Sequence, residues 1–316
     1  MSLTFYRRQL RTQQAKSIYD ALCRQIECGD TSGGYHVEVR EQSAALEDSF
    51  EAASALRLDR PDFFFLSRRY KGSLSGSQLT ISFERLYSPT QIHRIRALLD
   101  RMLNRFADGT RELSAWEREK TVYERVVEYA EYKDEGEEHD HNVVGFLLKK
   151  SSVCEGFSSL LTLGLRRAGI PCITVLGKAG ADSCWHSWNM AWINGSPCHL
   201  DASAETKTEN GIGFFYFNLT DREICRDRVI CTDGLPMCRD ASLSYCDHER
   251  IHFCSPERAA QYIAEAFRRG SEIVRVKLDE ESRVEESVCI GIQRAPRSAY
   301  AYRIGASQNA AVIERL

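Results

Sequence analysis

The chain has 316 residues, of which 43% are hydrophobic, and its formal net charge is −3 at pH 7. This length suffices for two domains, or for one large domain with extensions. The nearly balanced charge argues against a nucleic-acid-binding protein and against a polybasic contact with a membrane. No stretch approaches the roughly 18 apolar residues of a membrane span. Residues 1–26 contain arginines at 7, 8 and 11 and no continuous apolar run, so we do not expect a signal peptide there. We therefore expect a cytoplasmic protein with reduced cysteines.

The first 110 residues are expected to form an α+β domain of their own. Apolar spacing predicts amphipathic helices over 1–26, 43–58 and 88–106, and strands over 35–39 and 78–87. Three consecutive phenylalanines indicate a further buried strand over 62–66. Residues 108–110 read Asp-Gly-Thr and form the expected linker. No residue type in this segment suggests catalysis, so we expect a packing or substrate-binding role.

A cysteine at a predicted helix start is the first chemical feature of the middle segment. Ser114 with Glu117, and Ser152 with Glu155, fit the S-x-x-E capping box, so helices are expected to begin at both places. The second helix would carry Cys154 in its first turn, where free backbone N–H groups and the helix dipole favour a thiolate. The acidic run 133–141 before it is expected to be a solvent loop near the cleft.

A histidine and an aspartate follow on a predicted hairpin. Residues 184–193 and 197–201 flank Asn194-Gly195, a pair typical of a tight turn between two strands. Pairing across this turn would bring His186 close to Asp201. An aspartate there can fix the imidazole tautomer and stabilise the imidazolium.

Four sequence blocks in this order resemble the transglutaminase-like superfamily of papain-like cysteine enzymes over residues 114–226. The blocks are Val153-Cys154-Glu155-Gly156-Phe157, Gly169-Ile170-Pro171, His186-Ser187-Trp188-Asn189 and His199-Leu200-Asp201. The segments 141–145 and 217–221 are similar to an uncharacterised bacterial branch of that superfamily. The resemblance implies that Cys154 is the nucleophile, His186 the base and Asp201 the orienting group. Two departures are Ser187, where alanine is usual, and Ala202-Ser203-Ala204 after the aspartate.

The resemblance also implies a fold and its division. We expect an α+β protein with a papain-like core over 111–254, a helix packed on an antiparallel sheet. An N-terminal α+β domain over 1–110 and a C-terminal α/β extension over 255–316 would flank it. In that extension, periodicity predicts helices over 256–269 and 281–293, with strands over 273–278, 300–304 and 311–313.

Several assignments have alternatives. The oxyanion hole needs a donor besides the Cys154 N–H, and His141, Asn142 and Trp185 are candidates. His199 shares a strand face with Asp201 and is the rival base. Cysteine is also a common buried hydrophobe, so Cys154 has a purely structural interpretation.

Five cysteines over 225–254, with His248 and His252, suggest zinc. They contain no C-x2-C pair, so loop or core cysteines are the preferred interpretation.

We expect an enzyme that attacks an amide carbonyl of a protein or peptide through a thioester, with no metal and no organic cofactor. Resolution by water would make it a peptidase or amidase, and resolution by an amine a transglutaminase. The triad is common to both, and hydrolysis is preferred because no domains that would build an amine tunnel are found. A non-catalytic binding module on the same fold, and a zinc-stabilised interaction protein, are the alternatives. The sequence does not indicate the oligomeric state.

Overall fold

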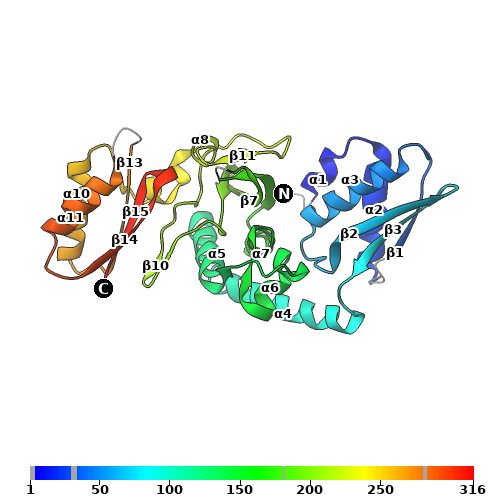
Figure 1. Ribbon diagram of the computed structural model, residues 1–316, viewed down its shortest axis with the longest axis horizontal. Helices are drawn as coiled ribbons and strands as arrows, with labels where there is room; N and C mark the ends of the chain where they lie inside the picture. The colour runs from blue at the N-terminus through cyan, green and yellow to red at the C-terminus, as the bar shows by residue number, and fades with distance from the viewer. Residues whose placement is uncertain (1–3, 30–33, 181, 280–282) are drawn as a thin grey trace.

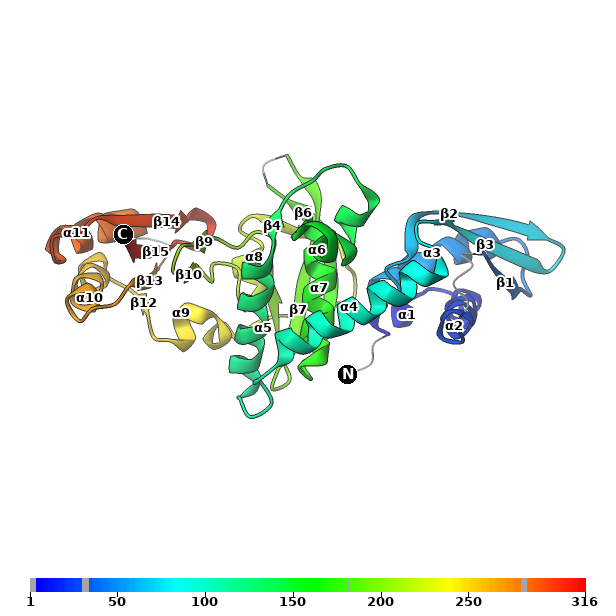
Figure 2. The ribbon, with the colours of Figure 1, turned by 90° about the horizontal axis from the view of Figure 1, so that it is seen from below.

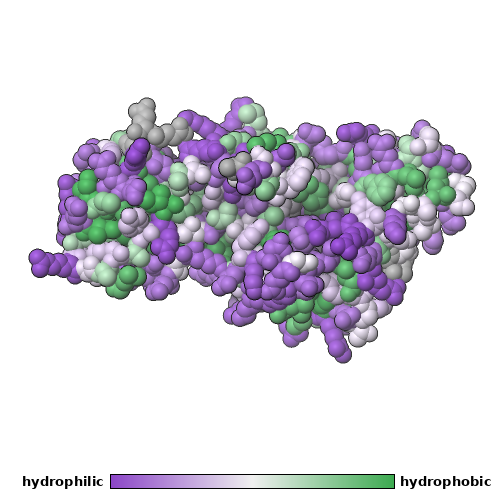
Figure 3. All heavy atoms as spheres, in the orientation of Figure 1, coloured by the Kyte–Doolittle hydropathy of each residue, from purple (hydrophilic) through white to green (hydrophobic). Residues whose placement is uncertain are grey.

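The computed structural model describes residues 4–29, 34–180, 182–279 and 283–316. The molecule is elongated, with an N-terminal unit and a C-terminal unit on opposite sides of a central core (Figure 1). None of the helices in these ranges is long and apolar enough to cross a membrane. In the view of Figure 3 most of the visible surface is hydrophilic. Hydrophobic residues form patches on both outer units and on the upper part of the core.

The N-terminal unit packs helices on a small antiparallel sheet. Its helices are α1 (Phe5–Gln9), α2 (Gln13–Glu27) and α3 (Ala45–Asp59), and its strands β1 (Gly34–Glu38), β2 (Leu66–Ser75) and β3 (Gln78–Arg85) lie in the order β1-β3-β2.

Two predictions for this unit were wrong. The first helix is broken after Gln9, because Thr12 starts a new helix by accepting a hydrogen bond from the Ala15 N–H. The three phenylalanines form no strand; they are buried in a turn before β2.

Helix α4 (Pro89–Ala107) leads from the N-terminal sheet to the core and packs on core helices (Figure 2). Ser88 caps it, and Gln91 completes a capping box. The core helices are α5 (Ala115–Tyr129), α6 (Val144–Lys149) and α7 (Cys154–Arg167). Ser114 and Glu117 form the predicted capping box at α5.

The core sheet holds four antiparallel strands. They are β6 (Cys172–Ala179), β7 (Cys184–Ile193), β8 (Ser196–Leu200) and β11 (Arg228–Ile230), in the order β11-β6-β7-β8. Helix α7 packs on β6 and β7, and it buries Leu160, Leu161 and Leu165. The predicted α+β class is therefore confirmed. Short elements complete the core and place parts of the site: β4 (Glu131–Tyr132), η1 (Glu138–His141), β5 (Ser151–Ser152), β9 (Lys207–Thr208), β10 (Gly211–Ile212), α8 (Asp221–Ile224), η2 (Ala241–Leu243) and α9 (Tyr245–His248).

The C-terminal unit has a hydrophobic cluster of its own, whereas one continuous cluster runs from Leu10 to Phe217 through the N-terminal unit and the core. Helices α10 (Pro256–Arg268) and α11 (Val284–Arg294) pack on a four-stranded sheet. Its strands, in the order in which they pair, are β12 (His252–Phe253), β13 (Ile273–Leu278), β15 (Ala310–Arg315) and β14 (Tyr300–Gly305). The short helix η3 (Ala306–Gln308) connects β14 to β15. Part of the helix predicted over 281–293 lies outside the described residues.

Candidate active site

Cys154 is the first residue of α7, but the predicted capping box before it was wrong. Ser152 lies in β5, paired in parallel with Tyr132, and its hydroxyl donates to the Asp140 carbonyl oxygen at 2.5 Å. Val153 is the N-cap residue and offers no side-chain cap. Because the Ser152 hydroxyl binds the Asp140 carbonyl, it does not cap α7. The N-cap residue therefore gives the N–H groups of the first turn no side-chain partner. This leaves a polar, electropositive helix end at the thiol.

The hairpin predicted for the histidine and the aspartate is present. Asn194 and Gly195 have φ of 51° and 91°, as a tight turn requires, and Asn189 pairs with Leu200. His186 Nε2 lies 2.7 Å from Asp201 Oδ2. The same imidazole interacts with the Cys154 thiol: it lowers the pKa of the thiol, and the thiol raises the pKa of the imidazole. The structure thus brings Cys154, His186 and Asp201 together, with the imidazole between the thiol and the carboxylate.

Both oxygens of the Asp201 carboxylate are used. Oδ1 accepts from the Ser203 hydroxyl at 2.7 Å and from the Ser203 and Ala204 N–H groups at 3.2 Å each. Oδ2 accepts from His186 and from Arg228 Nη2, the latter at 3.0 Å. The carboxylate is fully buried. The segment after the aspartate, where the sequence departs from the family pattern, therefore forms the turn that holds it.

The pKa shifts agree with a thiolate–imidazolium pair. Burial acts to raise the pKa of Cys154, but hydrogen bonding and charge from His186 outweigh it and lower that pKa. Burial acts to lower the pKa of His186, but Asp201 and Cys154 raise it to about 9. Asp201 is buried, which alone would raise its pKa, yet His186 and Arg228 lower it to about 2. His186 and Asp201 are thus held in their charged forms near neutral pH, and the pKa of Cys154 is shifted in favour of the thiolate.

Comparison with known proteins places the same region in a family. Residues 101–202 match the family model of the transglutaminase-like superfamily, and this range includes all three side chains. Residues 101–202 are thus similar to a transglutaminase-like core. No curated protein matches the chain.

Solved structures to which the chain is similar include one described as a TGase, at 11% identity and a TM-score of 0.31, covering 56% of this chain and 53% of that one. A putative cysteine protease from Cytophaga hutchinsonii has 15% identity and a TM-score of 0.25, covering 46% of this chain and 64% of its own. A putative protease from Parabacteroides distasonis has 12% identity and a TM-score of 0.27, covering 43% and 36%. The chain therefore spans less than two thirds of each of these proteins.

Tyr132 is a contact of the nucleophile in the transglutaminase-like core that sequence reasoning missed. Tyr132 lies beside Cys154, and the two groups interact electrostatically. The ring lies parallel to that of Phe157, with centroids 6.5 Å apart, and is 55% exposed. Burial is the largest cause that raises the Tyr132 pKa, so the phenol is neutral and can donate. A two-residue strand, β4, positions it, and such a strand has no sequence periodicity.

The candidate oxyanion donors differ in position. His141 Nδ1 lies 3.4 Å from Glu155 Oε2. Asn142 Oδ1 accepts from the Val144 N–H at 2.8 Å, and its Nδ2 donates to the Glu138 carbonyl at 3.4 Å. Both side chains are thus engaged with neighbours other than the thiol.

Trp185 differs from these two, because it is 72% exposed and lies on the same strand face as Ser187, two residues on. Ser187 contributes to lowering the pKa of the Cys154 thiol. Trp185 therefore shares a strand face with a residue that acts on the thiol.

The rival base, His199, lies in a different environment. It is fully buried; its Nδ1 accepts from Trp188 Nε1 at 3.1 Å, and its Nε2 lies 3.0 Å from Asp221 Oδ1. With Asp221 and Cys238 it forms the one group of potential metal ligands within the described ranges. The indole N–H requires a lone pair on Nδ1, so the proton of the neutral ring is on Nε2 and donates to Asp221. A metal would need that Nε2 lone pair, so a hydrogen-bonded core histidine fits better.

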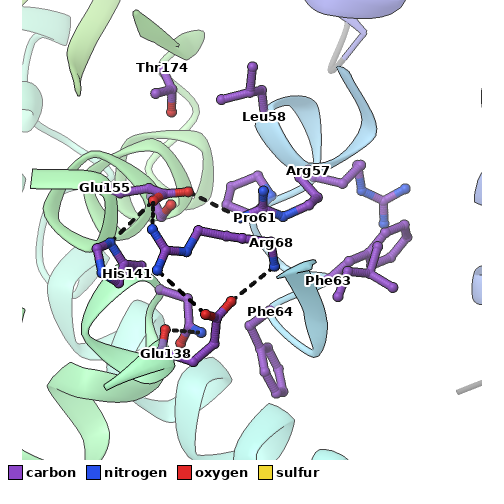
Figure 4. Close-up of a pocket in the computed structure, with 14 residues that line it drawn as sticks. Arg57, Leu58, Pro61, Phe63, Phe64, Arg68, Glu138, His141, Glu155 and Thr174 are labelled. Carbon is purple, nitrogen blue, oxygen red and sulfur yellow. Dashed lines mark hydrogen bonds and ion pairs between the residues drawn. The ribbon is translucent and has the colours of Figure 1, made fainter. Parts of the chain in front are cut away.

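Glu155, next to the nucleophile, joins the transglutaminase-like core to the N-terminal unit (Figure 4). Its carboxylate lies 3.1 Å from Arg57 Nη2 and 3.8 Å from Arg68 Nη1, at the edge of a cavity of about 40 Å³. Burial acts to raise the Glu155 pKa, but His141 and the two arginines lower it. This cavity is too small for a peptide, so the cluster is an ion-pair contact between the two units.

Proposed function

We propose that the protein is a cysteine-dependent enzyme that cleaves amide bonds of proteins or peptides. The observation that carries this function is the imidazole of His186, which interacts with a helix N-terminal thiol and forms a hydrogen bond with a buried carboxylate. A thiol nucleophile, a base within reach and a group that orients the base are the parts that acyl transfer needs.

The reaction runs in two halves. The Cys154 thiolate attacks the carbonyl carbon, and the Cys154 N–H stabilises the oxyanion that forms. His186 then gives its proton to the leaving nitrogen, so the C–N bond breaks and a thioester remains on Cys154. In the second half His186 takes a proton from water, the hydroxide attacks the thioester, and the carboxylic acid leaves as Cys154 regains its thiolate.

Hydrolysis is favoured over transfer to an amine because the surroundings of the thiol are open. Trp185, one residue before His186, is 72% exposed, and Tyr132, which lies beside Cys154, is 55% exposed. Selection of an amine over water requires a cleft that excludes water. Transfer to an amine is the second candidate function. We include protein or peptide substrates and a cytoplasmic location in the proposal of a hydrolase.

The function is tested with a set of fluorogenic peptide amides and a peptide carrying an acyl electrophile. We expect turnover of at least one amide and labelling of Cys154 ahead of the other cysteines, both lost in Cys154→Ser. Added primary amines in the same assay measure acyl transfer against hydrolysis. Absence of turnover together with labelling of Cys154 no faster than of Cys184, which is exposed, would favour a non-catalytic binding module.

A further inference from the structure

Arg228 places a second cation on the carboxylate of Asp201. Its Nη2 and Nε lie 3.0 and 3.3 Å from Oδ2, the same oxygen that His186 Nε2 contacts at 2.7 Å. Arg228 is 8% exposed and Asp201 is fully buried, so solvent screens this contact little. Sequence reasoning missed the residue because β11 reaches the site only by pairing with β6, where Arg228 lies opposite Ala179.

The guanidinium is held in place from several sides. Its centre lies 4.9 Å from the centroid of the Tyr216 ring, a cation–π distance. Its Nη1 lies 3.0 Å from Asp227 Oδ1, and the Tyr216 hydroxyl donates to Asp227 Oδ2 at 2.5 Å. A side chain fixed in this way keeps its position when His186 changes charge.

Two cations therefore share Oδ2, while neutral donors hold Oδ1. Because the Ser203 and Ala204 donors bind Oδ1, the carboxylate stays oriented without Arg228. What would change without Arg228 is the net charge around Asp201 and His186. The guanidinium repels the nearby imidazolium and neutralises part of the Asp201 charge. It therefore weakens the electrostatic stabilisation that Asp201 gives to protonated His186.

We propose that Arg228 is a positioning residue of the thiol site, which acts through Asp201 to limit how firmly His186 keeps its proton. This role rests on the proposed function for its effect on turnover. Without such a limit, the imidazolium would part with its proton to the leaving nitrogen less readily. The guanidinium thus tunes the acid that the first half-reaction needs.

The charged and titratable neighbours all enter this balance. His186 faces Cys154 and Asp201, and Cys154 in turn faces Tyr132. Asp201 faces His186 and Arg228, with the phenols of Tyr123 and Tyr216 nearby. The groups around Arg228 are Asp201, Asp227 and Tyr216. Neutralising Arg228 leaves the carboxylates of both Asp201 and Asp227 without their cation, and both then favour the imidazolium.

The test compares Arg228→Gln and Arg228→Lys with wild type. We expect the base limb of kcat/KM against pH to move up by about one unit or more in Arg228→Gln, since a neighbouring charge shifts a pKa by about 1–3 units. Arg228→Lys, which keeps the charge, should return the limb toward wild type. A uniform loss of activity with an unmoved pH profile would mean a merely structural role and would overturn the assignment.

A readout without turnover separates this inference from the proposed function. Titration of the His186 imidazole by NMR in a Cys154→Ser background should give the same upward shift on Arg228→Gln, whether or not any amide is cleaved. Asp227→Asn is the matched variant of opposite sign, because it leaves Arg228 less compensated and should move the His186 titration to lower pH. If Arg228→Gln does not fold, Asp227→Asn tests the proposal by itself. A His186 titration midpoint that is unchanged or higher in Asp227→Asn would contradict the role of Arg228.

Discussion

His186 Nε2 and Asp201 Oδ2 lie 2.7 Å apart on one side of the imidazole, which leaves Nδ1 as the nitrogen for the Cys154 thiol. His186 lies in β7 and Asp201 directly follows β8, so the hairpin turn at Asn194-Gly195 sets their distance. A pair fixed by backbone pairing needs no reorganisation when a substrate binds. This preorganisation allows a single histidine to take a proton from the thiol and to give it to the leaving group.

Replacing Cys154 with alanine should abolish amidase activity and leave the fold intact. The cysteine is only partly buried and lies in the first turn of α7, apart from the apolar side chains that pack this helix on the sheet. Loss of a partly exposed thiol should change the free energy of unfolding by less than about 1 kcal/mol. Thermal melting and turnover of a peptide amide check this. A variant that melts many degrees lower, or one with full activity, would contradict the nucleophile assignment.

Asp201→Asn and His186→Ala should differ in both activity and stability. The asparagine can still hold the ring but favours the wrong tautomer, which in a serine protease costs about 10⁴ in turnover. We therefore expect weak residual activity in Asp201→Asn and almost none in His186→Ala.

The stability of the two variants should follow the opposite order. Asp201→Asn also removes a buried partner of Arg228, so it should lower the melting temperature more than His186→Ala does. Equal activities in the two variants would show that another base serves the thiol.

Local sequence signals predicted most of the elements that carry the site. The Asn194-Gly195 turn indicated the hairpin, and the apolar spacing after Cys154 indicated α7. These signals are local, because turn dihedrals and helix periodicity depend on residues close in sequence. At the site, a local signal that failed was the capping pattern at Ser152, whose hydroxyl donates instead to the distant Asp140 carbonyl.

The contacts made by Arg228 and Tyr132 could not be predicted in this way. Each reaches the site from a strand of two or three residues, which is too short to show alternation. Arg228 depends on the pairing of β11 with β6, and Tyr132 on the pairing of β4 with β5. Tertiary pairing of this kind leaves no pattern in a single sequence.

A buried glutamate should make stability depend on pH. Glu119 is fully buried, and burial raises its pKa to about 8 although Asn218 Nδ2 donates to it at 2.7 Å. Its pKa is therefore higher in the folded than in the unfolded chain, so the folded protein binds more protons between these two values. Its contribution to stability is fully present below the unfolded pKa and is lost as pH rises through about 8. Glu119→Gln should melt close to wild type at pH 5 and several degrees above it at pH 9. Identical pH dependence of the two melting curves would show that Glu119 ionises as an ordinary carboxyl.

Activity against pH should be bell-shaped, with limbs that report the thiol and the imidazole. Hydrogen bonding and charge from His186 lower the pKa of Cys154, so the acid limb should lie below the ordinary range of a free thiol. Asp201 and Cys154 raise the pKa of His186 to about 9, so the proton for the leaving group is lost, and activity falls, as pH rises through that value. Cys154 and His186 titrate as a coupled pair, so the apparent pKa values of the two limbs describe the pair and not either residue alone. Ultraviolet thiolate absorbance, titrated in wild type and in Cys154→Ser, isolates this thiol by difference from the other cysteines. A difference curve with its midpoint at or above the free-thiol value of about 8.5 would identify Cys154 as an unactivated cysteine, and the enzyme function would be lost with it.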